Sequence, residues 1–473
     1  MPLAAARDEY KSWFEAATEE DERKGGLRWK AQERSNRYDY RVVRERLQEL
    51  QDVRASGDLK KLMYYFDEGI HGNMAGIGAP GLYRRAKTGT KDLIEDYIKA
   101  LDDSLHHLAT VDSKTFSLED RLSFFRRARQ AFGRCGLMLS GAGSLGPFHM
   151  GVSQALASQN LIPNVVSGAS AGSIVAAVLC THADDELLER LTDDAILDTL
   201  DQAQDLEVNP RSGRMGKDAV RLLIDSWIPD LTFAEAREVT GRSLNVSVAP
   251  SSMYQQSRTL NDVTSPNVLI REAVLASCAV PGVFPPVKLM ARGANGKRTP
   301  YVKTRSWVDG SVTNDMPRDR LARVHGCNFF IASQTNPVVR WAIGEPNSSN
   351  LLAQWVGVYQ AAAKEVVRKS YPLAMRITRS VAPLSEATRL WYSVVTQDYT
   401  ADVNILPKQR FWDPTKLLAP LSTERTLELI DSGRTATWPH IERIRNCTAV
   451  TRRVDESIDY PVSYTHLTLP TKA

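Results

Sequence analysis

Cysteine is scarce in this sequence, and the cysteines present do not form pairs. The 473 residues include five cysteines, scattered at positions 135, 180, 278, 327 and 447. An odd number of widely spaced cysteines predicts reduced, buried thiols and excludes the usual paired metal-ligand spacings. No metal site and no cofactor are therefore expected.

A strong charge of either sign is also absent. The formal net charge is only +4 over 473 residues, so the composition does not favour nucleic-acid binding. The residues after Met1 include no apolar segment of the kind found in secretory signals. The sequence therefore predicts an intracellular protein that is not secreted.

Charged side chains are missing altogether between Arg134 and Asp184, although 25% of the chain is charged. A membrane-spanning helix needs about 20 mostly apolar residues in one run, and Gly, Ser, Pro, Asn and Gln interrupt this segment at short intervals. The segment is instead typical of two β-α units in a buried parallel sheet. It predicts strands over 136–140 and 164–167, with helices over 147–158 and 173–179.

The first of these strands leads into a glycine-rich loop with the pattern G-x-G-x-x-G, formed by Gly141, Gly143 and Gly146. This pattern is the fingerprint of dinucleotide-binding folds, which also place an acidic residue about 20 residues further on. The stretch 165–171 contains no acid at that point, so a nucleotide partner is not predicted. The other use of such a loop is to point backbone N–H groups at an oxyanion.

The second strand leads into a G-x-S-x-G motif built from Gly168, Ser170 and Gly172. Small residues around the serine allow a sharp strand-to-helix turn that exposes the hydroxyl to a substrate carbonyl. The alternative is a turn whose serine merely caps the following helix. Because the two motifs end neighbouring strands, we expect the oxyanion donors and the nucleophile at the same edge of the sheet.

A serine nucleophile needs a base, and a third strand offers one. The stretch Ser306-Trp-Val-Asp309-Gly310 is a short apolar strand that ends in a tight turn and presents an aspartate. A Ser…Asp…His order is also open, because His325 and His440 follow the aspartate. Neither histidine belongs to a recognisable motif, and local hydrogen bonding is the simpler role for both.

At this point the chain resembles the patatin-like phospholipase family. The matching segments are Ser140-Gly-Ala-Gly-Ser-Leu-Gly146, Gly168-Ala-Ser-Ala-Gly172, Asp309-Gly310 and Ala276-Ser-Cys-Ala-Val-Pro-Gly-Val-Phe-Pro-Pro286. The resemblance implies an α/β fold, a three-layer sandwich with a mostly parallel central sheet, preceded here by a helical N-terminal region. The chain reads Asp-Gly-Ser where the family usually has Asp-Gly-Gly or Asp-Gly-Ala.

The resemblance also implies a Ser-Asp dyad that works without histidine. Ser170 would attack the ester and Asp309 would act as its base, while Gly141, Ala142 and Gly143 would lie at the oxyanion hole. An aspartate with a pKa of about 4 is a weak base for this task, and partial burial would raise its pKa. A dyad of this kind is expected to lack an acidic limb in the histidine range of the pH–rate profile.

The flanking regions resemble storage-lipid triacylglycerol lipases of yeast and plants and their bacterial relatives. The matching segments are Trp29-Lys30, Ser35-Asn-Arg-Tyr-Asp39, Gly89-Thr-Lys91, Gln397-Asp-Tyr-Thr400 and Ala436-Thr-Trp-Pro439. The implied activity is release of fatty acids from triacylglycerol at a membrane or lipid-droplet surface, by a cytoplasmic or peripherally bound protein. Phospholipase, lysophospholipase or transacylase activity with the same dyad is the alternative, as is non-catalytic lipid binding. The sequence does not indicate an oligomeric state.

The length favours two or three structural units. We expect a helical domain over 1–130, with helices over 9–17, 40–56, 59–68 and 90–108. A catalytic domain is expected over 131–335 and a mainly helical extension over 336–460. The last segment, 461–473, differs in character from the rest and resembles translated sequencing-adapter read-through, which predicts a disordered or non-native tail.

Two further segments leave alternatives open. The loop 280–286 contains prolines and a glycine that exclude regular structure, and it either shapes acyl-chain binding or is structural punctuation. The stretch 351–369 predicts a helix with an apolar stripe and a basic end, which suits either core packing or contact with a lipid interface.

Overall fold

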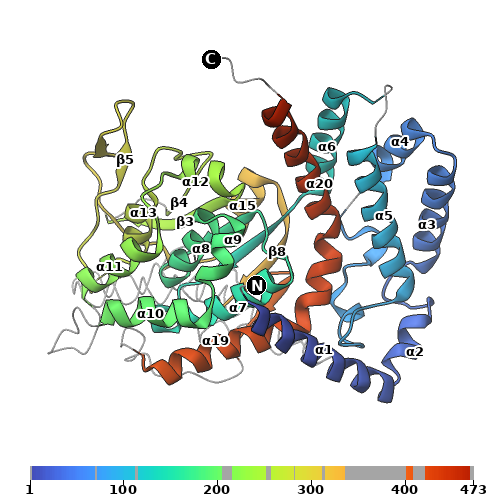
Figure 1. The fold of residues 1–473 in the computed structure, drawn as a ribbon, viewed down its shortest axis with the longest axis horizontal. Helices are drawn as coiled ribbons and strands as arrows, with labels where there is room; N and C mark the ends of the chain where they lie inside the picture. The colour runs from blue at the N-terminus through green and yellow to red at the C-terminus, as the bar shows by residue number, and fades with distance from the viewer. Residues whose placement is uncertain are drawn as a thin grey trace, which may run out of the picture. The chain divides into compact units, whose positions relative to one another are not determined.

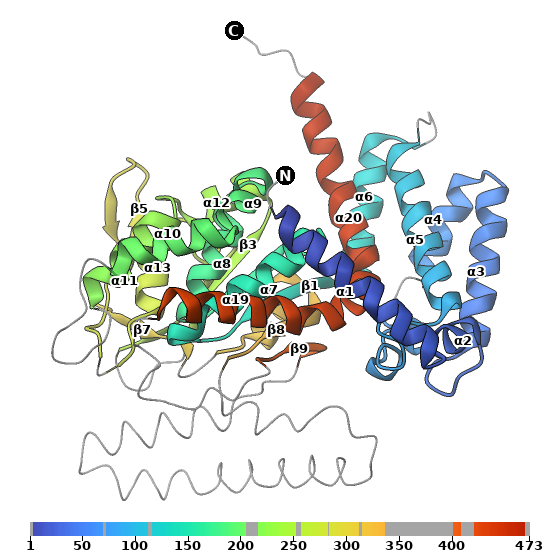
Figure 2. The ribbon, with the colours of Figure 1, turned by 60° about the horizontal axis from the view of Figure 1, so that its bottom comes forward.

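The computed structural model describes residues 3–69, 72–111, 116–204, 216–251, 257–281, 283–311, 315–335, 401–407 and 421–468. The chain divides into two compact units. The helical unit comprises 7–135, 325–329 and 438–473, and the sheet unit comprises 1–6, 136–324 and 330–437. Figure 1 and Figure 2 show the ribbons from two directions.

Helices make up nearly all of the regular structure in the helical unit. They are α1 (Ala4–Arg23), α2 (Gly26–Ala31), α3 (Tyr40–Ala55), α4 (Leu59–Gly69), α5 (Asp92–Thr110), α6 (Leu118–Phe132) and α20 (Ile441–Thr468). The predicted helical N-terminal region is thus confirmed, although the sequence analysis does not foresee α2 or α6. The backbone of α20 continues through most of the predicted tail, to Thr468.

Helix α5 shows why this unit folds as helices. Ile94, Tyr97, Leu101, Leu105 and Leu108 recur at intervals of three or four residues and are all buried in one apolar core. Residues from α3, α4, α6 and α20 complete that core. The α5 stripe therefore forms the centre on which the other helices pack.

One segment that carries the family resemblance serves to hold this unit together. Lys91 is only 1% exposed, and its ammonium lies 3.9 Å from the centre of the Trp29 ring while donating to the Trp29 carbonyl. A cation over an indole face is favourable, more so when removed from water. Burial lowers the pKa of Lys91, because its ammonium group has lost water. The contacts with Trp29 take the place of that water.

The sheet unit is built on strands β1 (Arg134–Leu139), β2 (Val165–Gly168), β3 (Ser243–Pro250), β4 (Arg258–Asn261), β7 (Trp307–Asp309), β8 (Cys327–Ser333) and β9 (Val403–Ile405). The strand order is β4-β3-β2-β1-β8-β9, with β7 also paired to β3. The pairs β1–β2, β2–β3 and β8–β9 are parallel, whereas β3–β4 and β3–β7 are antiparallel. The predicted α/β class with a mostly parallel central sheet is confirmed.

Strand β7 occupies a place beside β3 that β2 leaves free. Val248 pairs with Arg258 of β4 and also with Asp309 of β7, so β7 lies on the edge of β3 opposite β4. That edge is the one bonded to β2, whose last pair is Gly168 with Val246. Strand β2 ends at this pair. Asp309 pairs with β3 two residues further along, at Val248.

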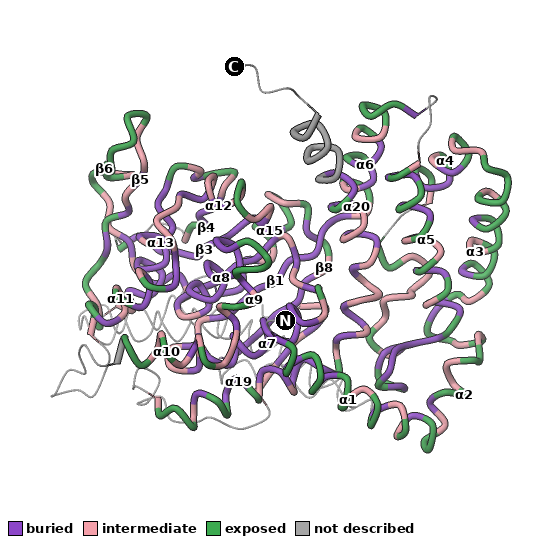
Figure 3. Tube along the Cα trace, in the orientation of Figure 1, coloured by how far each residue is buried: buried purple, intermediate pink, exposed green. Residues whose placement is uncertain are grey.

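The charge-free segment forms the buried centre of the sheet unit (Figure 3). All residues of β1 and β2 are buried, and so are those of α7 (Gly146–Ser158) from Pro147 onward. Helix α8 (Ala171–Thr181) is buried from Gly172 to its end. The two predicted β-α units are confirmed, and burial on all sides explains why no charged side chain is found there.

Helix α19 (Thr423–Thr437) packs closely against α7 through glycines on both helices. A Cβ added to Gly151 would lie 1.9 Å from the Ile430 carbonyl oxygen, and one added to Gly433 would lie 2.2 Å from that of Phe148. The two backbones can therefore approach only because both residues lack a side chain. Nothing in the local pattern of either helix predicts this contact.

The segments 336–400 and 408–420 lie outside the described residues, and with them the predicted helix over 351–369. Residues 403–405, within the predicted C-terminal extension, add β9 to the sheet beside β8. All five cysteines are free thiols, and all but Cys447 are buried. None of the helices in the described segments is both long and apolar enough to cross a membrane.

The glycine contact between α7 and α19 gives a stability prediction. Gly433→Ala should lower the free energy of unfolding by about 1–3 kcal/mol, because the helices must move apart. In an unconstrained helix the same change stabilises by up to about 1 kcal/mol, so the sign is diagnostic. Thermal unfolding of the variant is compared with that of Ser432→Ala, one residue earlier in α19. Equal melting temperatures for the two variants would contradict the contact.

Candidate active site

Ser170 stands at a strained turn between β2 and α8. Its backbone has φ 50° and ψ −130°, a region that non-glycine residues seldom adopt. A Cβ on Gly168 would lie 2.3 Å from the Gly172 carbonyl oxygen, and one on Gly172 would lie 2.4 Å from that of Ser140. These two motif glycines are thus required by close backbone approach. Gly146 is less constrained, since a Cβ there would meet its nearest neighbour, Ala171, at 3.6 Å.

A chain of serines holds the strained turn in place. The Ser170 N–H donates to Ser277 Oγ at 3.0 Å, and the Ser277 hydroxyl donates to the Ser247 carbonyl of β3 at 2.7 Å. On the other side, the Ser173 hydroxyl donates to the Ser170 carbonyl at 2.6 Å. In sequence, the segment 276–286 stands out only for its family resemblance. In the structure, its Ser277 links the Ser170 N–H to the backbone of β3.

Asp309 lies beside the Ser170 hydroxyl at the end of β7. The hydroxyl donates a hydrogen bond to its carboxylate, and the Ser311 N–H donates to Oδ1 at 2.8 Å. The next residue, Gly310, must be glycine because a Cβ there would lie 2.3 Å from the backbone of Ser247. The turn after β7 therefore fits directly against β3, which fixes the carboxylate beside Ser170.

Burial governs the basicity of this carboxylate. Asp309 is 2% exposed, and desolvation raises its pKa to about 6, against the hydrogen bonds from Ser311 and Ser170 that lower it. An aspartate with this pKa is ionised at neutral pH and is a better proton acceptor than an ordinary one. With its pKa raised to about 6, the carboxylate itself is expected to give an acidic limb in the histidine range, in place of the limb-free profile expected from the sequence.

The glycine-rich loop starts at the end of β1, beside the end of β2. Its residues differ in what their backbones do. The Gly141 N–H donates to Asp315 Oδ1 at 2.6 Å and is already engaged, whereas the prediction gave it to the oxyanion. Gly143 has φ +54° and lines the same cavity as Ser170. Ala142 is buried against Leu145 and Leu429.

Hydrogen bonds from His149 and Thr335 hold the start of this loop. His149, fully buried on α7, contacts the Ser140 carbonyl at 3.0 Å and Ser333 Oγ at 2.7 Å. The Thr335 hydroxyl donates to the Gly141 carbonyl at 3.1 Å. Burial lowers the pKa of His149 to about 4, so the ring is neutral and structural near pH 7. The sequence analysis does not single out His149, Thr335 or Asp315.

Ser170 lines an apolar cavity of about 140 Å³. Its walls include Met150, Ile174, Ile196, Leu223, Trp227 and Phe284. Val280 also lines it, so the loop 280–286 contributes two side chains to the cavity rather than serving as punctuation alone. An apolar cavity that reaches a buried serine hydroxyl suits a ligand with a hydrocarbon chain.

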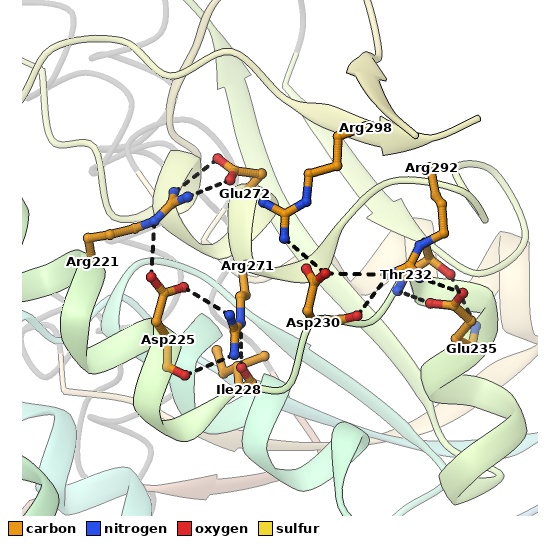
Figure 4. A network of polar contacts seen from close by, with 10 residues as sticks. All are labelled: Arg221, Asp225, Ile228, Asp230, Thr232, Glu235, Arg271, Glu272, Arg292 and Arg298. Carbon is orange, nitrogen blue, oxygen red and sulfur yellow. Dashed lines mark hydrogen bonds and ion pairs between the residues drawn. The ribbon is translucent and has the colours of Figure 1, made fainter. Parts of the chain in front are cut away.

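Ion pairs fix one wall of this cavity (Figure 4). Trp227 belongs to α11 (Lys217–Trp227), which is tied to α13 (Ile270–Ser277) by the charges drawn there. Arg221 binds Glu272 through two hydrogen bonds of 2.7 and 3.1 Å, and Asp225 pairs with Arg271 at 3.4 Å. Glu272 is buried, so this fork of two bonds is a well-placed anchor for α11.

Within the described residues, the groups that act on the pKa of Asp309 include neither of the histidines considered as alternative bases, His325 and His440. Burial lowers the pKa of His440 to about 4, assisted by Arg443 and Arg84. The side chains that bond to Asp309 are Ser170 and Ser311.

Two family descriptions match the chain. Residues 137–322 match "Patatin-like phospholipase", and residues 3–130 match "Domain of unknown function (DUF3336)". The first range contains the motif loop, Ser170 and Asp309. The second contains the N-terminal helices α1 to α5 and most of α6.

Curated relatives extend the similarity over almost the whole chain. "Triacylglycerol lipase ptl2" of Schizosaccharomyces pombe is 34% identical over 92% of this chain and 71% of its own length. "Triacylglycerol lipase 4" of Saccharomyces cerevisiae is 31% identical over 95% of this chain, which spans 52% of that relative. Among solved structures, VipD from Legionella pneumophila covers 69% of this chain and 68% of its own at 16% identity, with a TM-score of 0.31, too low to support an argument.

The pKa of Asp309 gives a prediction for the pH dependence. The carboxylate must be ionised to accept a proton, so kcat/KM for a soluble ester should fall about tenfold per pH unit below pH about 6. The profile is measured with p-nitrophenyl butyrate, subtracting the rate of Ser170→Ala at each pH. His325→Gln and His440→Gln should keep the limb. Its disappearance in either variant would assign it to that histidine instead.

Proposed function

The chain belongs to the patatin-like phospholipase family, and on that premise we propose that it is a triacylglycerol lipase acting through Ser170 and Asp309. The observation that carries the proposal is the hydrogen bond from the Ser170 hydroxyl to a buried carboxylate of raised pKa, at the wall of an apolar cavity. These features support the assignment of Ser170 as nucleophile, Asp309 as base and the cavity as the site for an acyl chain.

The chemistry begins with the transfer of the Ser170 hydroxyl proton to Asp309 as Oγ attacks the ester carbonyl. The tetrahedral oxyanion is stabilised by backbone N–H groups of the glycine-rich loop. Collapse breaks the bond to the alcohol oxygen, which takes the proton from Asp309 and leaves an acyl-serine. Water then gives a proton to Asp309 and attacks the acyl carbonyl, and the proton returns to Ser170 as the fatty acid leaves.

Triacylglycerol is favoured as the substrate by the names of two relatives, each of which matches more than 90% of the chain. The apolar lining of the cavity agrees with a long acyl chain but does not distinguish one lipid class from another. Phospholipids, lysophospholipids and transfer of the acyl group to another alcohol would use the same dyad.

We also propose that the sheet unit meets a lipid surface at the mouth of the cavity. Three partly exposed apolar side chains, Leu222, Val283 and Leu427, are each adjacent in sequence to a residue that lines the cavity, namely Leu223, Phe284 and Thr426. They come from three separate elements. Such side chains gain free energy when they leave water for an acyl-chain environment.

The dyad is tested by fatty-acid release from triolein and from phosphatidylcholine emulsions. Ser170→Ala should reduce release to background, and Asp309→Asn should reduce it about 10²–10⁴-fold, the usual contribution of a general base. Faster release from triolein supports the lipase, and faster release from phosphatidylcholine replaces it by a phospholipase. A folded protein that releases nothing and whose Ser170 resists fluorophosphonate labelling would instead be a lipid-binding protein.

The lipid-facing surface is tested by Leu222→Glu and Leu427→Glu. Each should lower the ratio of triolein to p-nitrophenyl butyrate hydrolysis at least about tenfold, because a charge replaces a side chain worth about 1.5–3 kcal/mol on burial. Val239→Glu is the matched control, since Val239 is 51% exposed on α12 (Phe233–Thr240), which contributes nothing to the cavity lining. An unchanged ratio in both test variants would refute docking through this surface.

A further inference from the structure

The first peptide of the glycine-rich loop is held at both ends by side chains. Asp315, two per cent exposed between β7 and α15 (Arg318–His325), accepts the Gly141 N–H at 2.6 Å. Thr335 donates its hydroxyl to the Gly141 carbonyl at 3.1 Å. Ser311 fills the space beside Gly141, because a Cβ added there would lie 2.9 Å from the Ser311 Cβ. Both polar groups of Gly141 are therefore engaged away from substrate.

The next two amides of the loop are in a different situation. Neither the Ala142 nor the Gly143 N–H donates a hydrogen bond to the part of the chain that the structure describes. Gly143 shares the cavity lining with Ser170, whereas neither Gly141 nor Ala142 is among the lining residues. The left-handed backbone of Gly143, with φ +54°, turns the chain immediately after these amides.

We propose that Asp315 is a positioning residue of the active site: by accepting the Gly141 amide it orients the loop so that the Ala142 and Gly143 amides form the oxyanion hole. The proposal rests on the acyl-hydrolase function proposed above and adds a residue to it. Asp315 touches no substrate and acts through the backbone that it holds. It also reduces the predicted three oxyanion donors to two.

The charge of Asp315 matters because the glycine-rich loop that it holds would stabilise the negative charge of the tetrahedral intermediate. Burial raises the pKa of Asp315 to about 8, aided by the neighbouring Asp309 and opposed by the Gly141 N–H. Asp315 is therefore protonated at neutral pH, while Asp309 is ionised. Above pH about 8 a second carboxylate charge would repel the oxyanion, since buried charges are poorly screened.

The test compares Asp315→Asn and Asp315→Ala on p-nitrophenyl butyrate between pH 5 and pH 9.5, with the Ser170→Ala rate subtracted. Asparagine keeps an oxygen acceptor for the Gly141 N–H but does not titrate. The wild type should lose kcat/KM as the pH rises through about 8, and Asp315→Asn should lack this alkaline limb while keeping the acidic limb. Asp315→Ala should lower kcat about 10–100-fold with little change in KM, because oxyanion donors act in the transition state.

Asp319→Asn, an exposed aspartate on α15, is the matched control and should keep both limbs. An alkaline limb that persists in Asp315→Asn, or a kcat of Asp315→Ala equal to that of the wild type, would overturn the proposal. Should Asp315→Ala not fold, the profile of Asp315→Asn still decides it. Ester hydrolysis that survives in Ser170→Ala would instead refute the function on which the proposal rests.

Discussion

Burying a carboxylate beside a hydroxyl is the constraint on which this active site depends. Removed from water, Asp309 holds its proton more tightly, and its pKa of about 6 brings it close to the range where a general base is effective near neutral pH. The cost of ionising it is limited by the N–H of Ser311 and the hydroxyl of Ser170, which both donate to it. Solvent exposure of Asp309 would remove the basicity, and the loss of those donors would favour its protonated form.

The sheet provides this burial through an unusual use of one edge of β3. Strand β2 pairs with its first half and then turns away at Gly168, and β7 pairs with its second half in the opposite direction. Ser170 and Asp309 thus come from two chain segments that both pair with β3. The backbone strain at Ser170 is tolerated because Ser277, which is hydrogen-bonded to β3, also accepts the Ser170 N–H and so fixes the turn.

Much of this arrangement could be predicted from local patterns. The charge-free segment indicated two buried β-α units, and the motif spacing placed Ser170 and the glycine-rich loop after neighbouring strands, where the structure has them. The positioning contacts could not be foreseen. Ser277, Asp315 and Thr335 are ordinary polar residues in sequence, and only the fold brings them to the backbone of Ser170 and Gly141.

By itself the sequence determined which residues are candidates for the proposed chemistry and which strands they follow, because periodicity and turn residues act over a few neighbours. The tertiary structure alone decided the pKa values of the buried carboxyl groups and the orientation of the backbone N–H groups around them. The raised pKa values of Asp309 and Asp315 come from burial by distant segments, and the Gly141 N–H faces Asp315, 174 positions away, rather than the cavity. Desolvation and hydrogen-bond geometry depend on what surrounds an atom, and those surroundings exist only once the chain has folded.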